Sequence, residues 1–219
     1  MREPFGRGDR ILVLAPHPDD EILLAGAALW RARRQGAWVA FVILTDGQAS
    51  QPGSPTWPAA RLAKRRRSEA RRALARLGFG GAPLRFMGWE DGRLTEQARL
   101  LRLRRQVAGW RPNVLMTAAD SDHHRDHKAA HALARRLRPP AARLYPVPLW
   151  TKLTMPDLTP AKGAGYAAKR WAMAAHRSQL AGTITDSADA FAFTPELLRL
   201  ICDTPELLRE ELGRRRRAR

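Results

Sequence analysis

The stretch RILVLAPHPDDEILLAGAALW, residues 10–30, passes from a continuous apolar run to a histidine and three consecutive acids, and then becomes apolar again. The run at 10–15 favours a strand that is covered on both faces, as in a parallel sheet. The residues of about 21–35 favour a helix, because apolar side chains recur there at helical spacing. A buried strand followed at once by a helix predicts the first half of a βαβ unit.

Short apolar runs alternate with amphipathic segments along the rest of the chain. This pattern predicts further strands over 38–44, 84–87, 114–117 and 144–149. It predicts further helices up to Gly78, over 95–110, 124–137 and 166–179, and two short ones with N-caps at Thr194 and Thr204. We therefore expect an α/β fold: a single Rossmann-like domain, residues 1–219, with a mostly parallel sheet flanked by helices on both faces and a helical C-terminal tail over 181–219.

The composition is that of a chain that can bury a substantial core, with 219 residues of which 44% are hydrophobic. The single cysteine, Cys202, excludes an intrachain disulfide and a thiolate metal cluster, and we expect it to be an ordinary helix residue. The sequence has neither a membrane-spanning apolar run nor a secretory signal, so we expect a cytoplasmic protein.

The net charge of +18 raises the question of a polyanionic partner. The basic residues are mostly arginines, however, and they are spread along the whole chain. We expect the two dense runs, 64–67 and 214–217, to be a solvated helix face and a solvated tail. We expect no dedicated nucleic-acid partner, and a basic nucleic-acid-binding module without enzymatic activity remains a rival that a salt titration against DNA would decide.

The acids that follow the first predicted strand lie where open α/β sheets bind ligands, at the carboxyl ends of the strands. One interpretation is an acidic N-cap, since Asp19 and Asp20 would begin the next helix and helix N-termini favour anions. The neighbouring His17 favours a second interpretation. A turn that carries His17 and Asp20 can direct an imidazole and a carboxylate at one point, which suits zinc.

A second cluster, DSDHHRDHKAAH at 120–131, follows another predicted strand and holds four of the six histidines. It can supply the third donor that a catalytic metal site needs. His127 and His131 have the spacing of a metalloprotease helix, but Lys128 stands where that motif needs a glutamate. We therefore exclude that chemistry and expect His131 to pack or to support a ligand.

The two clusters together, HPDDE at 17–21 and HHRDH at 123–127, resemble the paired motifs of the PIG-L (LmbE-like) family of zinc-dependent N-deacetylases. The similarity runs in order over about residues 10–180. The chain departs from the family at Arg125, where proline is common, and His123 offers an alternative donor. Four further segments resemble the family: TDGQAS (45–50), RRSEARRALARLG (66–78), MGWEDGRL (87–94) and KRWAMAAHRSQ (169–179).

The resemblance implies that His17, Asp20 and His127 bind Zn²⁺, or Fe²⁺ or another divalent ion in its place. Three protein ligands with one open position are how catalytic zinc is held. Asp19 is then the general base, because it neighbours a ligand without being one. His124 would balance the oxyanion and pass a proton to the leaving amine, with Asp126 raising the pKa of His124 and orienting it.

Arg66 and Asp91 are the candidate substrate contacts, the first for a hydroxyl or phosphate oxygen and the second for sugar hydroxyls. The alternatives are a solvated Arg66 within its basic run and an Asp91 that builds a turn before Gly92. His176 either reaches the site or caps a helix end.

The implied activity is a hydrolase that removes the N-acetyl group from an amino sugar of an N-acetylglucosamine-type conjugate. One alternative is an amidase acting on a related thiol-sugar conjugate, and another is a binding protein without turnover, which the intact Asp19 disfavours. The expected partner is the N-acetylated sugar or glycoconjugate. The sequence leaves the acceptor molecule and the formation of a homo-oligomer open.

Overall fold

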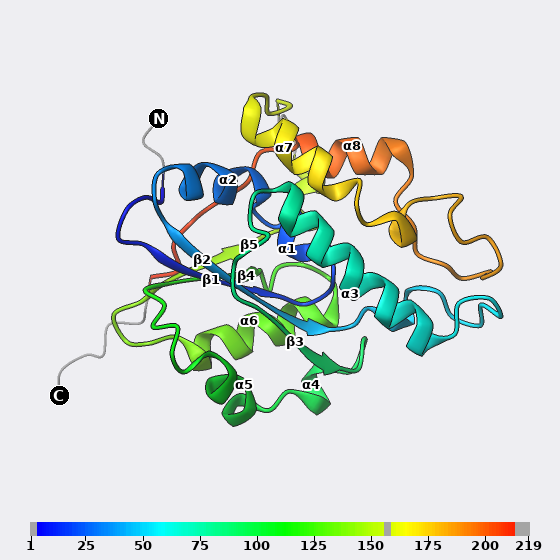
Figure 1. Cartoon of the computed structure of the whole chain (residues 1–219), viewed down its shortest axis with the longest axis horizontal. Coiled ribbons are helices and arrows are strands. Elements are labelled where there is room, and N and C mark those ends of the chain that lie inside the picture. Colours follow the sequence, from blue (N-terminus) through cyan, green and yellow to red (C-terminus); the bar gives the residue numbers. More distant parts are fainter. Residues whose placement is uncertain (1–3, 156–158, 213–219) are drawn as a thin grey trace.

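The computed structural model describes residues 4–155 and 159–212, and these form a five-stranded sheet in the order β3-β2-β1-β4-β5 (Figure 1). Every strand pairs in parallel with its neighbour. The α/β class and the parallel sheet predicted from the sequence are confirmed. The strands are β1 (Arg10–Ala15), β2 (Trp38–Thr45), β3 (Leu84–Trp89), β4 (Val114–Ala118) and β5 (Arg143–Val147).

The direction of strand addition changes at the centre of the sheet. From β1 the chain proceeds to β2 and β3 on one side, and later to β4 and β5 on the other. In open α/β sheets such a switch point leaves a crevice at the carboxyl ends of the central strands. The two His/Asp clusters therefore meet, because one follows β1 and the other follows β4.

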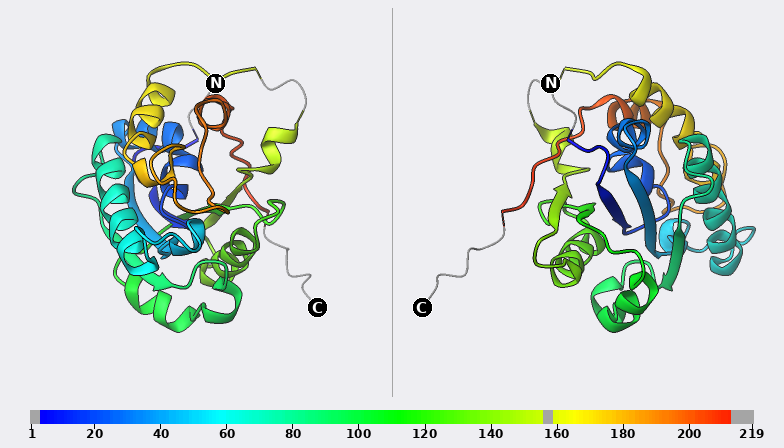
Figure 2. Two further views of the ribbon diagram at one scale, coloured as in Figure 1. Left: turned by 90° about the vertical axis from the view of Figure 1, so that its right-hand side faces the viewer. Right: turned by 60° about the vertical axis from the view of Figure 1, so that its left-hand side comes forward.

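Helices cover both faces of the sheet (Figures 1 and 2). Alternate residues of β1 point to opposite faces of the sheet. Ile11 and Val13 pack in the core with one group of helices, and Leu12 and Leu14 pack in the core with the other group. The first group is α1 (Asp20–Leu23), α2 (Gly26–Arg34), α3 (Ala59–Arg76), α7 (Ala164–Met173) and α8 (Pro195–Asp203). The second group is α4 (Leu94–Gln97), α5 (Leu100–Val107) and α6 (Arg125–Leu137), and short 3-10 helices lie at η1 (Gln48–Ser50), η2 (Thr151–Thr154) and η3 (Arg177–Gln179).

The predicted first helix is broken into α1 and α2, which is a correction. The break leaves the carbonyl of Leu23 and the N–H groups of Ala27 and Ala28 outside the helical ladder. Lys169 Nζ donates to the Leu23 carbonyl at 2.8 Å. The Glu206 carboxylate accepts from Ala27 and Ala28 at 2.9 and 2.7 Å. Lys169 and Glu206 form a buried ion pair of 2.9 Å, so partners far along the chain satisfy the interrupted backbone.

The second predicted tail helix, at Thr204, is also wrong, since residues 204–212 contain no helix. The extended path lets Glu206 reach the N-terminus of α2 and lets Glu211 donate its N–H to Leu144 at 2.7 Å. The first tail helix, α8, forms as expected with the Thr194 hydroxyl accepting from the Leu197 N–H, and it buries Cys202. The basic run 214–217 lies outside the described residues.

The basic run 64–67 is not a uniformly solvated face of α3. Lys64 is exposed, but Arg66 is only 2% exposed and Arg67 forms an ion pair with Asp46. A helix presents consecutive side chains at different angles, so one run serves both the surface and the interior. The helix predicted over 95–110 forms as α4 and α5. None of the helices in residues 4–155 and 159–212 combines the length and the apolar composition of a membrane-spanning segment.

Candidate active site

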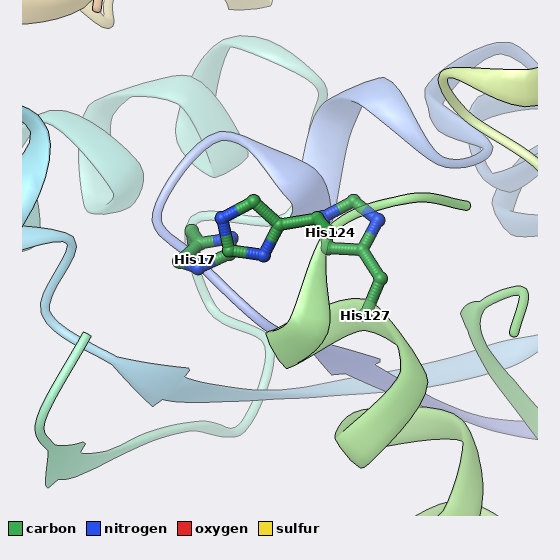
Figure 3. A group of neighbouring side chains, drawn as sticks. All are labelled: His17, His124 and His127. Atoms are coloured by element: carbon green, nitrogen blue, oxygen red, sulfur yellow. The ribbon is translucent and has the colours of Figure 1, made fainter. Parts of the chain in front are cut away.

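Three histidine rings converge at the carboxyl edge of the sheet (Figure 3). His17 follows β1, His124 is the N-cap of α6 and His127 lies in the first turn of α6. The His124 ring centroid is 4.7 Å from that of His17 and 5.2 Å from that of His127. Each ring offers a nitrogen, and these nitrogens lie within 4.8 Å of one another.

Asp20 lies between two of these rings. Its Oδ2 is 3.1 Å from Nδ1 of His17 and 3.5 Å from Nε2 of His127. A tetrahedral zinc ion with bonds of about 2.0–2.1 Å holds its ligand atoms roughly 3.3 Å apart. The donor types and their spacing therefore fit a divalent metal ion bound by His17, Asp20 and His127.

The other nitrogen of each of these two histidines faces a carboxylate. Nδ1 of His127 is 2.9 Å from Asp122, and Nε2 of His17 is 3.1 Å from Asp91 and 3.3 Å from Asp126. Metal-binding histidines in proteins almost always have such a partner, which fixes the tautomer and the ring orientation. The arrangement directs Nδ1 of His17 and Nε2 of His127 toward Asp20.

His17, Asp91 and Asp126 form a second group of donors within 4.8 Å. The Asp126 carboxylate in that group accepts from the N–H groups of Gly92 at 2.7 Å and Leu94 at 3.1 Å. These contacts occupy Asp126 and fix the 91–94 turn. We therefore interpret Asp126 as a group that orients His17 rather than as a metal ligand.

The electrostatics of the site favour a cation. Burial alone would lower the pKa of His127, but the carboxylates of Asp20 and Asp122 outweigh it and raise that pKa to about 9. The pKa of His17 is likewise raised against the effect of burial, chiefly by Asp126 and Asp20. Burial would raise the pKa of Asp20, yet His127 and His17 hold it well below the usual range. Without a metal ion the imidazoles keep protons to balance the acids, and a metal ion would displace those protons.

Asp122 is a site residue that the sequence reasoning did not single out. Its carboxylate accepts from the consecutive N–H groups of Leu149, Trp150 and Thr151 at 3.0–3.1 Å, in addition to its contact with His127. These donors lie beyond β5. The signal in the sequence was its place directly after β4, but two other aspartates share that segment, and only the fold shows which one meets His127.

Asp19 lies beside the proposed ligands in an unusual backbone conformation, with φ at 131°. Its N–H donates to the Glu21 carboxylate at 2.7 Å, and its own carboxylate is 3.0 Å from the Arg66 guanidinium. Burial raises the pKa of Asp19 to about 7, with Arg66 opposing the rise and Asp20 adding to it. A carboxylate with a pKa near neutrality is suited to accept a proton.

Arg66 faces this base from α3. Its guanidinium also donates to the carbonyls of Pro18 and, at 2.7 Å, of Gly47. Gly47 has a φ of 63°, and a Cβ there would lie 1.9 Å from Nη1 of Arg66. The Thr-Asp-Gly segment thus makes room for Arg66, while Asp46 pairs with Arg67. Arg66 is therefore not a solvated side chain, and because it also lines the cavity its contact with substrate stays a prediction.

His124 is turned differently from the expectation. Its Nδ1 accepts from the N–H of Asp126 at 3.2 Å, so the neutral ring carries its proton on Nε2. Burial lowers the pKa of His124, and the charges of His17 and His127 lower it further. The charge of Asp126 does raise the pKa of His124, as predicted, but burial and the two neighbouring histidines outweigh it, so the net shift is downward. The Asp126 carboxylate itself contacts His17 and not His124, so its predicted role in orienting the His124 ring is not seen.

Asp91 and His176 each have a defined partner in the site. Asp91 accepts from the Ala49 N–H at 3.0 Å, and its contact with His17 helps to lower its pKa to about 2 against the effect of burial. Asp91 therefore lies in the site and does more than build a turn. His176 is fully buried and lies 2.8 Å from Glu21, which also holds the Asp19 N–H.

His131 lies outside the candidate site. Its Nε2 is 2.6 Å from Glu211 and its Nδ1 is 3.2 Å from Asp120. These contacts attach the extended C-terminal segment to α6, as expected for a packing histidine.

A cavity of about 590 Å³ opens over these residues, a size typical of small-molecule sites. Asp19, Asp20, Arg66, Asp91 and the three clustered histidines line one part of it. Its remaining lining includes Leu23, Gln179 and the aromatic side chains of Trp150, Phe191 and Phe193.

Comparisons with known proteins agree with this geometry. Residues 12–137 match the family model PIG-L, described as GlcNAc-PI de-N-acetylase. A 1D-myo-inositol 2-acetamido-2-deoxy-alpha-D-glucopyranoside deacetylase from Corynebacterium jeikeium is 32% identical over 161 residues, which cover 56% of this chain and 48% of the relative. A protein of the same description from Thermomonospora curvata is 31% identical, covering 83% of this chain and 65% of the relative.

The chain thus spans between about half and two thirds of the length of these curated relatives. Among solved structures, the N,N'-diacetylchitobiose deacetylase of Pyrococcus horikoshii superposes with a TM-score of 0.64 at 18% identity, covering 80% of this chain and 72% of that one. At that identity the likeness shows a shared fold.

Proposed function

The chain belongs to the PIG-L family, and on that premise we propose that it is a metal-dependent hydrolase that removes the N-acetyl group from an amino sugar of an N-acetylglucosamine-type conjugate. The observation that carries the proposal is the position of Asp20 Oδ2 between His17 and His127, each backed by a carboxylate. The names of the curated relatives, which are deacetylases of an acetamido sugar linked to inositol, support the substrate class.

His17, Asp20 and His127 are the residues that would hold the ion, which we propose to be Zn²⁺, with Fe²⁺ or another divalent ion as substitutes. When bound, it supplies a Lewis acid that polarises the amide carbonyl. Two imidazoles and one carboxylate leave room for a further ligand, as catalytic zinc sites do. The carboxylates of Asp122 and Asp126 keep the two ligand rings in place.

Asp19 is the proposed general base. It takes a proton from water as the water oxygen adds to the amide carbon. When the C–N bond breaks, the proton passes to the leaving nitrogen, so acetate and the free amine form and Asp19 returns to its starting state. Arg66 and Glu21 hold its carboxylate and its backbone N–H respectively, so the base is positioned before substrate arrives.

His124 is the proposed stabiliser of the oxyanion. With Nδ1 accepting from the helix backbone, Nε2 carries the proton and can donate it as a hydrogen bond to the amide oxygen as negative charge develops. A neutral imidazole is sufficient for this role, which agrees with the lowered pKa of His124.

Two residues remain proposed determinants of substrate binding. Asp91 has oxygens at the cavity and can accept from a sugar hydroxyl beside His17. Both terminal nitrogens of the Arg66 guanidinium donate to protein groups, so we propose that Arg66 acts on the substrate chiefly through Asp19. We keep the cytoplasm as the proposed compartment and a single domain as the proposed organisation.

The proposal is tested by measuring acetate release from a panel of N-acetylated sugars: free N-acetylglucosamine, its inositol conjugate and N,N'-diacetylchitobiose. We expect release by the Zn²⁺-loaded protein and loss of release after chelation, with recovery on adding Zn²⁺. Metal-loaded protein that releases acetate from none of these sugars would contradict it. Release of a larger acid from thiol-sugar amides, in place of acetate, would favour the alternative amidase.

A further inference from the structure

Three aromatic rings form a wall of the cavity that holds the candidate active site. Trp150 and Phe193 are stacked, with centroids 6.3 Å apart and planes inclined by 6°. Phe191 meets both edge-on, at 5.9 Å from Trp150 and 5.0 Å from Phe193. Phe193 is 2% exposed, whereas Phe191 is 40% exposed. The aromatic wall, defined as these three residues, therefore has a packed base and one open face.

The backbone fixes the aromatic wall to both halves of the site. The Trp150 N–H donates to Asp122, the carboxylate that orients His127. The Phe191 N–H donates at 2.9 Å to the carbonyl of Ser50, whose hydroxyl lies 3.4 Å from the Arg66 guanidinium. The wall is thus held in a constant position relative to the proposed metal ligands and the proposed base.

Further hydrogen bonds hold the loop that carries the two phenylalanines. Gln51 donates its side-chain amide to the Phe191 carbonyl at 3.1 Å, and the Phe193 N–H donates to the Gln179 carbonyl at 2.7 Å. Asp186 of the same loop accepts from the hydroxyls of Ser54 and Thr56. The segments 46–58 and 180–194 lie side by side in Figure 1. Phe191 is therefore preorganised, so binding against it orders little additional chain.

The wall comes from a part of the chain beyond the family match, which ends at residue 137. The polar groups of the site, from His17 to His127, lie within that match. The matched part thus supplies the proposed chemistry, and the later part supplies an apolar surface in the same cavity.

We propose that the aromatic wall binds an apolar group of the substrate, so that the enzyme acts preferentially on amino sugars that carry an alkyl or aryl substituent. This rests on the proposed function. Covering the half-exposed Phe191 with an apolar group is favourable, whereas its phenyl ring has no polar atom that could replace the water around a sugar hydroxyl. The substituent can be the aglycone or a longer acyl chain, and the two sources have the same chemistry.

Two substrate series separate these sources. The first keeps the acetamide and varies the glycoside of N-acetylglucosamine from hydrogen to methyl, phenyl and hexyl, with acetate release as the measurement. The second keeps free glucosamine and lengthens the N-acyl group from acetyl to butanoyl and octanoyl, with glucosamine release as the measurement. Covering about 100 Å² of apolar surface corresponds to roughly a 50-fold rise in kcat/KM along one series.

Phe191→Ala is the test variant, Phe191→Leu retains an apolar side chain, and Leu101→Ala is the control because Leu101 is a 66% exposed residue of α5. We expect Phe191→Ala to remove most of the rise, so that kcat/KM for the phenyl and hexyl sugars falls toward the value that the same variant shows with unsubstituted N-acetylglucosamine. Phe191→Leu should retain a large part of the rise in kcat/KM, and Leu101→Ala should leave the rise unchanged. A flat response in both series, or a rise that survives Phe191→Ala, would overturn the proposal.

Binding of phenyl β-glucoside, which has no amide, provides a readout that does not depend on catalysis. Calorimetry on the Zn²⁺-loaded protein should show at least tenfold weaker binding for Phe191→Ala than for the unaltered chain. Equal affinity of the two proteins contradicts the aromatic-wall proposal. Absence of any amide hydrolysis with this affinity difference intact contradicts the proposed function alone.

Discussion

The guanidinium of Arg66 lies 3.0 Å from the carboxylate of Asp19, and both side chains are buried. Arg66 comes from α3 and Asp19 from the loop after β1, so the contact joins two elements that both line the cavity. The positive charge opposes the rise in the pKa of Asp19 that burial causes. Arg66 thereby favours the ionised form of Asp19, which is the form that can accept a proton.

Replacing Arg66 should therefore impair the base without removing the metal. In Arg66→Met the pKa of Asp19 should rise, because burial is no longer opposed by the guanidinium. More Asp19 is then protonated at neutral pH, so kcat should fall on the order of 100-fold and the acid limb of the pH–rate profile should move to higher pH. Arg72→Ala, an exposed change on the same helix, is the control. An unshifted limb with unchanged kcat would show that Arg66 does not act on the base.

The variants His127→Ala and His124→Ala should differ in how much metal they bind. His127→Ala should lose most bound metal, because it removes a proposed ligand together with the ring that Asp122 orients. His124→Ala should keep close to one ion per chain and lose roughly 100-fold in kcat, since it removes a hydrogen-bond donor and not a ligand. Elemental analysis of chelator-free protein measures the difference. Equal retention of metal by both variants would refute the assignment of His127.

Gly47 should matter in two ways: it adopts a positive φ, and its lack of a side chain leaves room for Arg66. Gly47→Ala and Gly53→Ala both place a Cβ at positive φ, 63° and 70° respectively, which costs about 1–2 kcal/mol of stability. Only the first also collides with a side chain, at 1.9 Å from Arg66, whereas no atom lies within 4 Å of a Cβ at Gly53. We expect the two variants to lose comparable stability in urea unfolding, or Gly47→Ala more. Acetate release should fall only in Gly47→Ala, and a comparable fall in both would contradict the role of the contact.

Lys152 should make the metal-free protein more stable as pH rises above neutrality. Its side chain is fully buried, and within the described part of the chain Nζ has no hydrogen-bond partner. Burial, with a contribution from Lys169, lowers the pKa of Lys152 to about 7. The unfolded chain, with a lysine pKa of about 10.4, binds one more proton than the folded chain between these values, so stability increases with pH there.

The increase attributable to Lys152 is about 3 kcal/mol between pH 7 and pH 9.5. The free energy of unfolding in urea is measured for the metal-free unaltered chain and for Lys152→Met at both pH values. The change between pH 7 and pH 9.5 in the unaltered chain, minus the change in the variant, gives the contribution of Lys152. Lys152→Met should be the more stable protein at pH 7, and the difference in unfolding free energy between the two proteins should be smaller at pH 9.5. A gap that is the same at both values would mean that Lys152 is charged in the folded state.

The sequence predicted the sheet and the meeting of the two clusters because both follow from local patterns. The continuous apolar run of β1 and the placement of His17 and His124 after two strands of a parallel sheet depend on neighbours in the chain. The break between α1 and α2 could not be predicted in this way. Its backbone groups are satisfied by Lys169 and Glu206, which lie more than a hundred residues away.

The details of the site depended on contacts of the same long-range kind. Arg66 belongs to a basic run that is typical of a solvated helix, and only the approach of Pro18 and Gly47 makes it a buried partner of Asp19. Proximity in the sequence pairs Asp126 with His124, whereas the fold brings the Asp126 carboxylate to His17.

Acetate release by Asp19→Asn, compared with the unaltered chain at equal Zn²⁺ content, tests the central claim most directly. The substitution keeps the shape of the side chain and removes its ability to accept a proton. The account predicts that the variant binds one ion per chain and retains less than about 1% of the turnover of an N-acetylated amino sugar. Turnover equal to that of the unaltered chain, with the same metal content, would contradict it.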